Sequence, residues 1–238
     1  MTNSDKPLDA LVFAPHPDDA EIGMGGTIAK MIAAGLRVGV VDMTRGEWGT
    51  KGTVEIRAEE IRSATTILGL HYRVNMDLGD GRIWDNDENR IKVVELIRKM
   101  KCPAIFVTSS FDRHPDHLAA AELVGNAFFY VRLPKFETES PPFSPRRCFH
   151  YLVHDLSHVT FAVNITDFFA KKIEALQAYC SQFVDPVLPS DYHYIGMSDY
   201  LAQIEAGNRT IGTQIGAKYA EGFYVRSLIA VPLPTWIE

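Results

Sequence analysis

The chain has 238 residues, which fits one α/β domain, and we expect residues 1–238 to form a single domain. Its formal net charge is −6 and no lysine/arginine cluster forms a basic face, which disfavours a nucleic-acid ligand and favours a small molecule. The three cysteines are far apart and form no C-x-x-C pair, so a disulfide framework and a cysteine zinc site are disfavoured, and a cytoplasmic location is expected.

Strand-like and helix-like segments alternate through the first half of the sequence. The first apolar run, 8–14, is short and is followed by two aspartates, so it reads as a buried strand rather than a signal peptide or membrane span. The expected strands are 8–14, 37–43, 72–75 and 104–108, and the expected helices are 19–34, 53–68, 88–101 and 114–130. This alternation predicts an α/β fold, a Rossmann-like, doubly wound and mainly parallel sheet in three α/β/α layers.

The second half of the sequence is less regular. Residues 133–147 hold four prolines and read as a loop. The expected elements that remain are strands at 149–153, 159–165 and 223–231, and helices at 167–179 and 196–218. No repeat or linker separates a second domain.

Two short motifs follow two of the expected strands. H-P-D-D begins at His16, directly after the first strand, and H-P-D-H begins at His114, directly after the fourth. Ligands of open parallel sheets bind beyond the carboxyl ends of the strands, so the two motifs are expected to meet there. Histidine and aspartate are common zinc ligands, and a catalytic zinc takes three of them plus water. One turn separates His114 from His117, so one can bind metal while the other faces the substrate.

The alternative is that these polar residues serve as helix caps. Asp18, Asp19 and Asp116 are all suited to an N-cap or a first helical turn. Each motif alone leaves that alternative open, but the two together, each after a strand, favour a metal site. The other histidines read as ordinary polar or core residues, although His193 lies in a loop that could cover the site.

A glycine-rich segment, 44–53, links the second strand to its helix. Its three glycines allow a ligand to approach the backbone closely. Arg57 follows one turn into the helix and could reach a substrate oxygen or carboxylate. The alternative is a flexible loop with a surface arginine.

Other enzyme classes fit the sequence less well. The run 23–26 resembles a dinucleotide-binding fingerprint, but Ile28 stands where the third glycine belongs and the helix starts before the glycines. We expect these glycines to permit tight packing of helix against sheet. No G-x-S-x-G elbow, Walker loop or H-E-x-x-H motif is present.

These motifs resemble the PIG-L/LmbE-like zinc deacetylase family. The likeness lies in HPDDAEIGMGGTIAK from His16, TRGEWGTKGTVEIRAEE from Thr44 and RHPDH from Arg113. A weaker likeness, in AYCSQF from Ala178 and IGTQIGAKYAEGF from Ile211, is greatest to the branch that deacetylates N-acetylglucosaminyl malate in bacillithiol biosynthesis.

The resemblance implies a role for each residue of the two motifs. It implies that the zinc ligands are His16, Asp19 and His117. It implies Asp18 as general base, and His114 as the group that stabilises the oxyanion or protonates the leaving amine. Asp116 would orient His114 and favour its charged form. Ferrous iron or cobalt would also suit this ligand set.

The resemblance also implies a substrate and an assembly. Arg57 resembles the substrate-binding arginine of the family, and Glu47, Gln182 and His193 are further candidate substrate contacts. The expected partner is a small N-acetylated sugar conjugate, not a nucleic acid or a membrane. The resemblance implies a homo-oligomer, since members of the family form homo-oligomers that include hexamers. The alternatives are an amidase for another amino-sugar or thiol conjugate and a non-catalytic metal-binding protein, although binding alone would not need Asp18.

Overall fold

The fold is built on one mixed sheet. The structure, a computed structural model, describes residues 7–183 and 200–229. The strands are β1 Ala10–Ala14, β2 Val38–Asp42, β3 Tyr72–Asn75, β4 Ala104–Thr108, β5 Arg147–Tyr151, β6 Phe161–Asn164 and β7 Ala220–Tyr224. The helices are α1 Asp19–Ala33, α2 Val54–Leu68, α3 Asp87–Met100, α4 Pro115–Tyr130, α5 Phe169–Gln177, α6 Cys180–Phe183 and α7 Tyr200–Gln214, with a 3-10 turn at Thr166–Phe168.

The seven strands lie in the order β3-β2-β1-β4-β5-β7-β6. The first five in this order are parallel, whereas β7 is antiparallel to both of its neighbours. The expected α/β class and mainly parallel sheet are confirmed, with an antiparallel pair added at one edge. No helix within the described ranges is both long and apolar enough to cross a bilayer.

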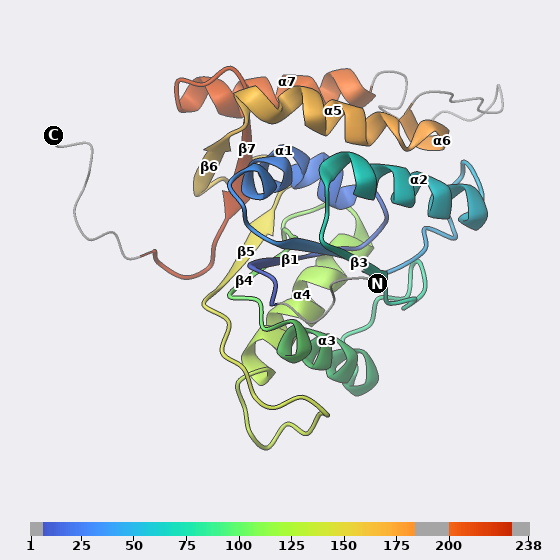
Figure 1. The fold of residues 1–238 in the computed structure, drawn as a ribbon, viewed down its shortest axis with the longest axis vertical. Coiled ribbons are helices and arrows are strands. Elements are labelled where there is room, and N and C mark those ends of the chain that lie inside the picture. Colours follow the sequence, from blue (N-terminus) through green and yellow to red (C-terminus); the bar gives the residue numbers. More distant parts are fainter. Residues whose placement is uncertain (1–6, 184–199, 230–238) are drawn as a thin grey trace, which may run out of the picture.

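Helices cover both faces of the sheet (Figure 1). Helices α1, α2, α5 and α7 lie on one face, and α3 and α4 on the other, so the expected three layers are confirmed. A buried apolar cluster fills each interface between sheet and helices. Local signals set the helix ends: Thr53 caps α2 by accepting the Ile56 N–H at 3.3 Å, and Gly69 ends it at a φ of 75°.

One expected strand is displaced. The apolar run 223–231 predicted the last strand, but β7 begins at Ala220 and ends at Tyr224, and residues beyond 229 lie outside the described part. The reason is Glu221, which is fully buried in the strand and pairs with the equally buried Lys172 at 2.7 Å. A buried charged pair interrupts the hydrophobic pattern by which a core strand is recognised.

The glycines of α1 permit close packing, as expected from the sequence. A Cβ at Gly23 would overlap the buried Tyr151 ring, and one at Gly26 would lie 2.7 Å from Ile165 Cδ1. We predict that Gly23→Ala lowers the free energy of unfolding by about 1–3 kcal/mol because of overpacking, measured by urea denaturation. Gly125→Ala in α4 is the control, since its Cβ meets nothing nearer than 3.8 Å. Equal stability of both variants would show that the contact at Gly23 is not limiting.

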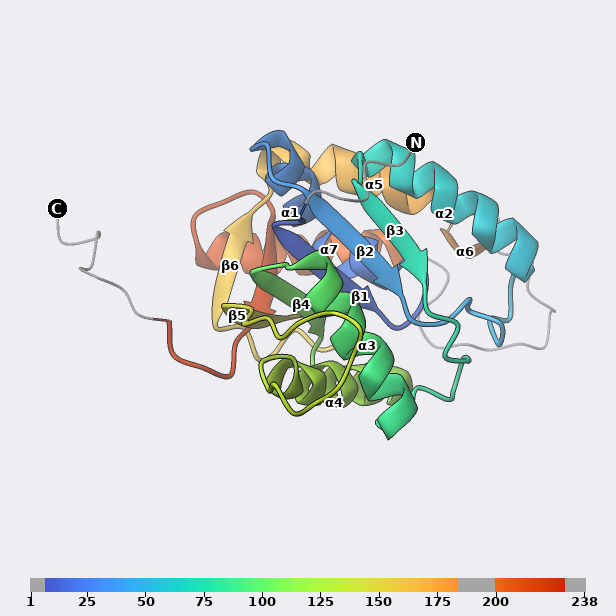
Figure 2. The same ribbon diagram turned by 60° about the horizontal axis from the view of Figure 1, so that its bottom comes forward.

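The topology brings the two sequence motifs together. Strands β1 and β4 are neighbours in the sheet, yet α1 and α4, which follow them, lie on opposite faces (Figure 2). The chain therefore diverges at this point and leaves a crevice beyond the carboxyl ends of the two strands. Such a topological switch point is where open α/β sheets bind their ligands.

Candidate active site

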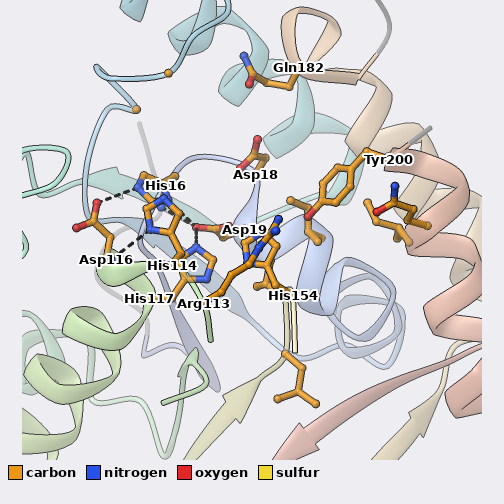
Figure 3. A pocket seen from close by; sticks show the side chains of 18 of the residues that line it. His16, Asp18, Asp19, Arg113, His114, Asp116, His117, His154, Gln182 and Tyr200 are labelled. Atoms are coloured by element: carbon orange, nitrogen blue, oxygen red, sulfur yellow. Dashed lines mark hydrogen bonds and ion pairs between the residues drawn. The ribbon is translucent and has the colours of Figure 1, made fainter. Parts of the chain in front are cut away.

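A cavity of about 1060 Å³ opens at the switch point. Both motifs line it, through His16, Asp18, Asp19, His114, Asp116 and His117 (Figure 3). Residues one hundred positions apart touch here, because His16 Nε2 lies 3.0 Å from Asp116 Oδ2. The predicted meeting of the two motifs is confirmed.

Two histidines converge on one carboxylate oxygen. His16 Nδ1 and His117 Nε2 each lie 3.1 Å from Oδ2 of Asp19. The same oxygen accepts the backbone N–H of His16 at 2.9 Å, which fixes the loop between β1 and α1. The side chains of Asp19 and His117 are buried, at 6% and 1% exposure. Three candidate ligands are thus held against one another inside the protein.

The opposite nitrogen of each histidine faces another carboxylate. His16 Nε2 lies 3.0 Å from Asp116 Oδ2 and 3.2 Å from Asp80 Oδ1. His117 Nδ1 lies 3.1 Å from Asp112 Oδ2. Histidines that bind metals usually donate their second ring N–H to a carboxylate, which fixes the tautomer and orients the ring. His16 Nε2 makes such a hydrogen bond with Asp116, whereas His117 Nδ1 and Asp112 are within ion-pair distance but are not aligned for one.

This pairing leaves two nitrogen lone pairs facing an anion. If the outer nitrogens carry the protons, then His16 Nδ1 and His117 Nε2 both present lone pairs to Asp19. Burial lowers the pKa of His117, but Asp19 and Asp112 outweigh it and raise the pKa to about 9. The pKa of His16 is also raised, by contacts that outweigh burial. The pocket therefore favours a positive charge, and a divalent cation fits the donor set.

His114 is placed differently from the other two histidines. It is the N-cap of α4, and its Nδ1 accepts the backbone N–H of Asp116 at 3.2 Å. In the neutral ring the proton must then lie on Nε2, so His114 has no free lone pair for a metal, although it lies in a group with His16 and His117 that could otherwise hold one. The neutral ring can instead donate a hydrogen bond from Nε2.

Asp116 raises the pKa of His114, as expected, but other groups outweigh it. Burial, together with the charges of His16 and His117, lowers the pKa of His114, and the opposing effect of Asp116 is smaller. Asp116 orients the His114 ring through its backbone N–H alone, since its carboxylate contacts His16 and accepts the Gly81 N–H at 2.8 Å.

Asp18 does not act as a helix cap. Although it occupies the N-cap position of α1, its carboxylate makes no capping hydrogen bond and instead accepts Arg57 Nη1 at 3.0 Å. Its φ of 109° is in the left-handed region, which costs free energy for an aspartate. Burial raises the pKa of Asp18 to about 6, against the opposing effect of Arg57. A strained, buried carboxylate beside a metal-ligand group is typical of a functional residue.

The candidate substrate contacts are only partly brought together. Arg57 and Gln182 line the cavity, and Arg57 Nε is buried without a hydrogen-bond partner in the part of the chain that the structure describes. Glu47 is not among the described lining residues; its carboxylate accepts the backbone N–H groups of Arg45 at 2.8 Å and Asp80 at 3.2 Å, so it closes the loop instead. His193 lies outside the described residues.

Three functional residues are not predicted by the sequence motifs. Asp80 contacts His16, and Asp112 lies between two histidines, 3.1 Å from His117 Nδ1 and 2.8 Å from His154 Nδ1. From the sequence His154 reads as an ordinary polar residue, yet it lines the cavity and stacks on His117 with ring centroids 5.2 Å apart. Their places in the sequence could have predicted two of them. Asp80 and His154 follow the ends of β3 and β5, at the same edge of the sheet as the two motifs.

Several known proteins are similar to this chain in sequence and in fold. The family model "PIG-L: GlcNAc-PI de-N-acetylase" matches residues 11–128. The chain is 30% identical over 231 residues to diacetylchitobiose deacetylase of Thermococcus kodakarensis, covering 89% of this chain and 80% of that protein. It is 26% identical over 190 residues to a probable N-acetyl-alpha-D-glucosaminyl L-malate deacetylase 2 of Bacillus anthracis, covering 74% of this chain and 82% of that protein.

A solved structure extends the likeness to nearly the whole chain. The crystal structure of the conserved protein TT1542 from Thermus thermophilus matches with a TM-score of 0.85 and 38% identity, covering 95% of this chain and 99% of that one. The resemblance inferred from the two histidine motifs is therefore confirmed. The chain belongs to the PIG-L family of de-N-acetylases.

Proposed function

We propose that this protein is a metal-dependent N-deacetylase that hydrolyses the acetamide of an N-acetylglucosamine conjugate. The observation that carries the proposal is the convergence of His16 Nδ1 and His117 Nε2 on Asp19, with a second carboxylate, Asp18, held beside them by Arg57. Three ligand groups and a separate base are what metal-assisted hydrolysis needs. Deacetylases among the relatives support the same reaction class.

We assign the metal to His16, Asp19 and His117. The nitrogen and oxygen donors suit zinc, and they also suit ferrous iron or cobalt. When bound, zinc would supply a Lewis acid that polarises the amide carbonyl and lowers the pKa of a water. Asp80, Asp112 and Asp116 would hold the two ligand histidines in the required tautomer.

The remaining residues handle protons and charge. Asp18 accepts a proton from the water that attacks the carbonyl carbon, and it returns that proton to the nitrogen as the C–N bond breaks. Neutral His114 donates from Nε2 to the carbonyl oxygen as negative charge develops there. Arg57 holds the Asp18 carboxylate through Nη1, while its unpartnered Nε is free to donate to a substrate oxygen.

A non-catalytic metal-binding protein is the main alternative from another class. Metal binding alone would not require Asp18 to adopt a φ of 109° or to bind Arg57 rather than the metal group. Burying an ionisable group in a strained conformation costs free energy, and residues that carry such a cost are typically ones that serve the chemistry. If the protein only binds metal, Asp18→Asn should leave its metal binding unchanged and there should be no hydrolysis to lose.

The finer proposal is that the substrate is N-acetylglucosaminyl malate, on the way to bacillithiol, in the cytoplasm. Its support is the malate deacetylase among the relatives, along with the weaker motifs after Ala178 and Ile211. The test is free-amine release from the malate conjugate, from diacetylchitobiose and from N-acetylglucosamine by metal-loaded protein. Fast release from the malate conjugate alone supports the finer proposal. Equal release from all three retains the deacetylase and rejects the malate assignment.

Asp112 provides a prediction about metal affinity. Since Asp112 bridges His117 and His154, Asp112→Asn should weaken metal binding by about 10- to 100-fold, because the orienting carboxylate of a ligand histidine is lost. Competition with a chromogenic chelator measures the affinity. Asp87→Asn is the matched control, as that side chain is 94% exposed. Unchanged metal affinity in Asp112→Asn would show that His117 is not a ligand or that Asp112 does not orient it.

The expected homo-oligomer stays a prediction. Size-exclusion chromatography with light scattering tests it directly, and a monomer at micromolar concentration would contradict it.

A further inference from the structure

The residues that line the cavity include a polar group, called here the polar arm, and an apolar group, called the apolar arm; Arg113, His154 and Gln203 line the cavity as well. The polar arm is lined by Gly46, Thr50, Arg57, Asp80 and Gln182. The apolar arm is lined by Ile22, Leu152, Leu156, Ile204 and Ile211. Asp116, which contacts His16 beside Asp80, and Tyr200, the first residue of α7, lie at opposite sides of the site in Figure 3, with Asp19 between them. Ile204 packs with Ile22, and Gly207 lies against Leu156, so apolar side chains gather along the α7 side of the cavity.

The apolar arm is longer than an acetyl group requires. Its wall on α7 extends from Ile204 to Ile211, two helical turns or about 10 Å at 1.5 Å per residue. The methyl of an acetyl group would contact only the beginning of such a wall. An extended apolar surface that opens on a reaction centre favours a substituent that can cover it.

One polar group within the apolar arm lacks a partner. The Asn208 side chain is 7% exposed and lines the cavity, and its Nδ2 donates to the Ala220 carbonyl at 3.0 Å. Because a carbonyl accepts only from the NH₂ group, this contact fixes the amide orientation. Among residues 7–183 and 200–229, Oδ1 then has no hydrogen-bond partner. Buried acceptors of this kind are normally satisfied, so Asn208 indicates a ligand that brings a donor.

We propose that the apolar arm binds the acyl group of the substrate, so that the protein removes N-acyl groups longer than acetyl and favours chains that carry a hydroxyl or N–H donor for Asn208. This inference rests on the proposed function. The sugar has hydroxyls that need polar partners, which places it in the polar arm. The two substituents of an amide leave the carbonyl carbon and the nitrogen in opposite directions, so the acyl chain enters the apolar arm.

The reaction is amide hydrolysis for every chain length. Water adds its oxygen to the carbonyl carbon, the C–N bond breaks, and the proton taken from water goes to the nitrogen. The products are a free amino sugar and the carboxylate of the chain. The chemistry at the metal-ligand residues is unchanged, and only the group that occupies the apolar arm differs.

A chain-length series tests the proposal. Metal-loaded protein is assayed for free-amine release from N-acetyl-, N-butanoyl-, N-hexanoyl- and N-(6-hydroxyhexanoyl)glucosamine. We expect kcat/KM to rise roughly tenfold or more from acetyl to hexanoyl, since each buried methylene adds favourable transfer free energy. The hydroxylated chain should exceed hexanoyl, and Asn208→Leu should abolish that difference. Thermal unfolding confirms that each variant is folded.

A matched pair of variants narrows the apolar arm or leaves it open. Gly207 faces the cavity, and a Cβ there would lie 2.8 Å from Leu156 Cδ1, the flexible end of a side chain that can move. Gly207→Leu should therefore fill the arm and lower the ratio of hexanoyl to acetyl hydrolysis about tenfold or more. Ala206→Leu, on the exposed side of the same helix, is the control and should change neither rate.

The outcomes separate this inference from the proposed function. Hydrolysis that is fastest for the acetyl compound and slows with every added carbon overturns the inference and leaves the deacetylase intact. Faster hydrolysis of hexyl N-acetylglucosaminide, blocked by Gly207→Leu, also overturns it, because the arm would then hold the group attached to the sugar. If metal-loaded protein releases amine from N-acetylglucosaminyl malate or diacetylchitobiose but hydrolyses no compound of the series, the inference fails and the deacetylase stands. If it hydrolyses neither the series nor those two conjugates, both proposals fail.

Discussion

Asp18→Asn is expected to lower kcat by about two to four orders of magnitude while metal content stays unchanged. Asparagine is nearly the same size as aspartate and keeps an oxygen that can accept from Arg57, but it cannot take a proton from water. The ligand groups converge on Asp19 rather than Asp18, so the metal site should survive. Single-turnover rates with an N-acetylglucosamine conjugate, together with metal analysis of the same sample, check both parts.

The two parts of this prediction can fail separately. A variant that loses its metal would make Asp18 a ligand, and the base would have to be sought elsewhere. A variant with normal turnover and normal metal content would leave the proposed mechanism without a base. Glu59→Gln is a suitable control, because that side chain is 77% exposed on α2 and should alter neither quantity.

His117→Ala should have the opposite pattern and lose the metal together with activity. The side chain is 1% exposed and contributes the nitrogen that lies 3.1 Å from Asp19 Oδ2. Its removal leaves two ligand groups where catalytic zinc sites need three, so we expect no stoichiometric metal after dialysis. Inductively coupled plasma mass spectrometry measures the metal, and circular dichroism checks the fold.

A distant histidine provides the control for that variant. His158 is exposed and stacks on Phe111 with ring centroids 4.0 Å apart. His158→Ala should keep full metal content. Full metal content in His117→Ala would instead exclude His117 as a ligand and favour a set that includes His16 and its partners Asp80 and Asp116, which also form a group able to hold a metal.

The sequence predicts the first half of the fold well for physical reasons. Strands β1, β2 and β4 are short apolar runs with their own turn signals, and α2 has local caps at both ends, Thr53 and Gly69. The displaced β7 shows the limit of this reasoning. Its Glu221 is satisfied by Lys172 and by the backbone N–H groups of Gly26 and Thr27, contacts between segments far apart in the chain.

The candidate site follows the same division. The motifs at His16 and His114 are local, and their positions at two strand ends suffice to predict that they meet. The tautomer of His114 cannot be predicted from the sequence, because it depends on the loop geometry that directs the Asp116 N–H to Nδ1. Nor is the role of Asp112, since it contacts His154 across 42 positions of sequence. The positions of the motifs predict which residues meet, and tertiary packing decides the protonation of those residues.

Solved structures with low sequence identity show that this fold alone does not determine the reaction. A match at 18% identity, to 4-carboxy-2-hydroxymuconate hydratase of Pseudomonas putida KT2440, has a TM-score of 0.77. A likeness of that degree concerns the fold alone. The reaction proposed for this chain therefore depends on Asp18, His114 and the three ligand groups, not on the sheet that carries them.

The stoichiometry of the products tests most directly whether the protein is a metal-dependent N-deacetylase. Protein loaded with one zinc ion per chain is incubated with N-acetylglucosaminyl malate or diacetylchitobiose, and acetate and free amine are quantified together. Metal-dependent deacetylation predicts equal amounts of both products, loss of the reaction after chelation and recovery on adding zinc. Absence of both products from protein that holds its metal would contradict it.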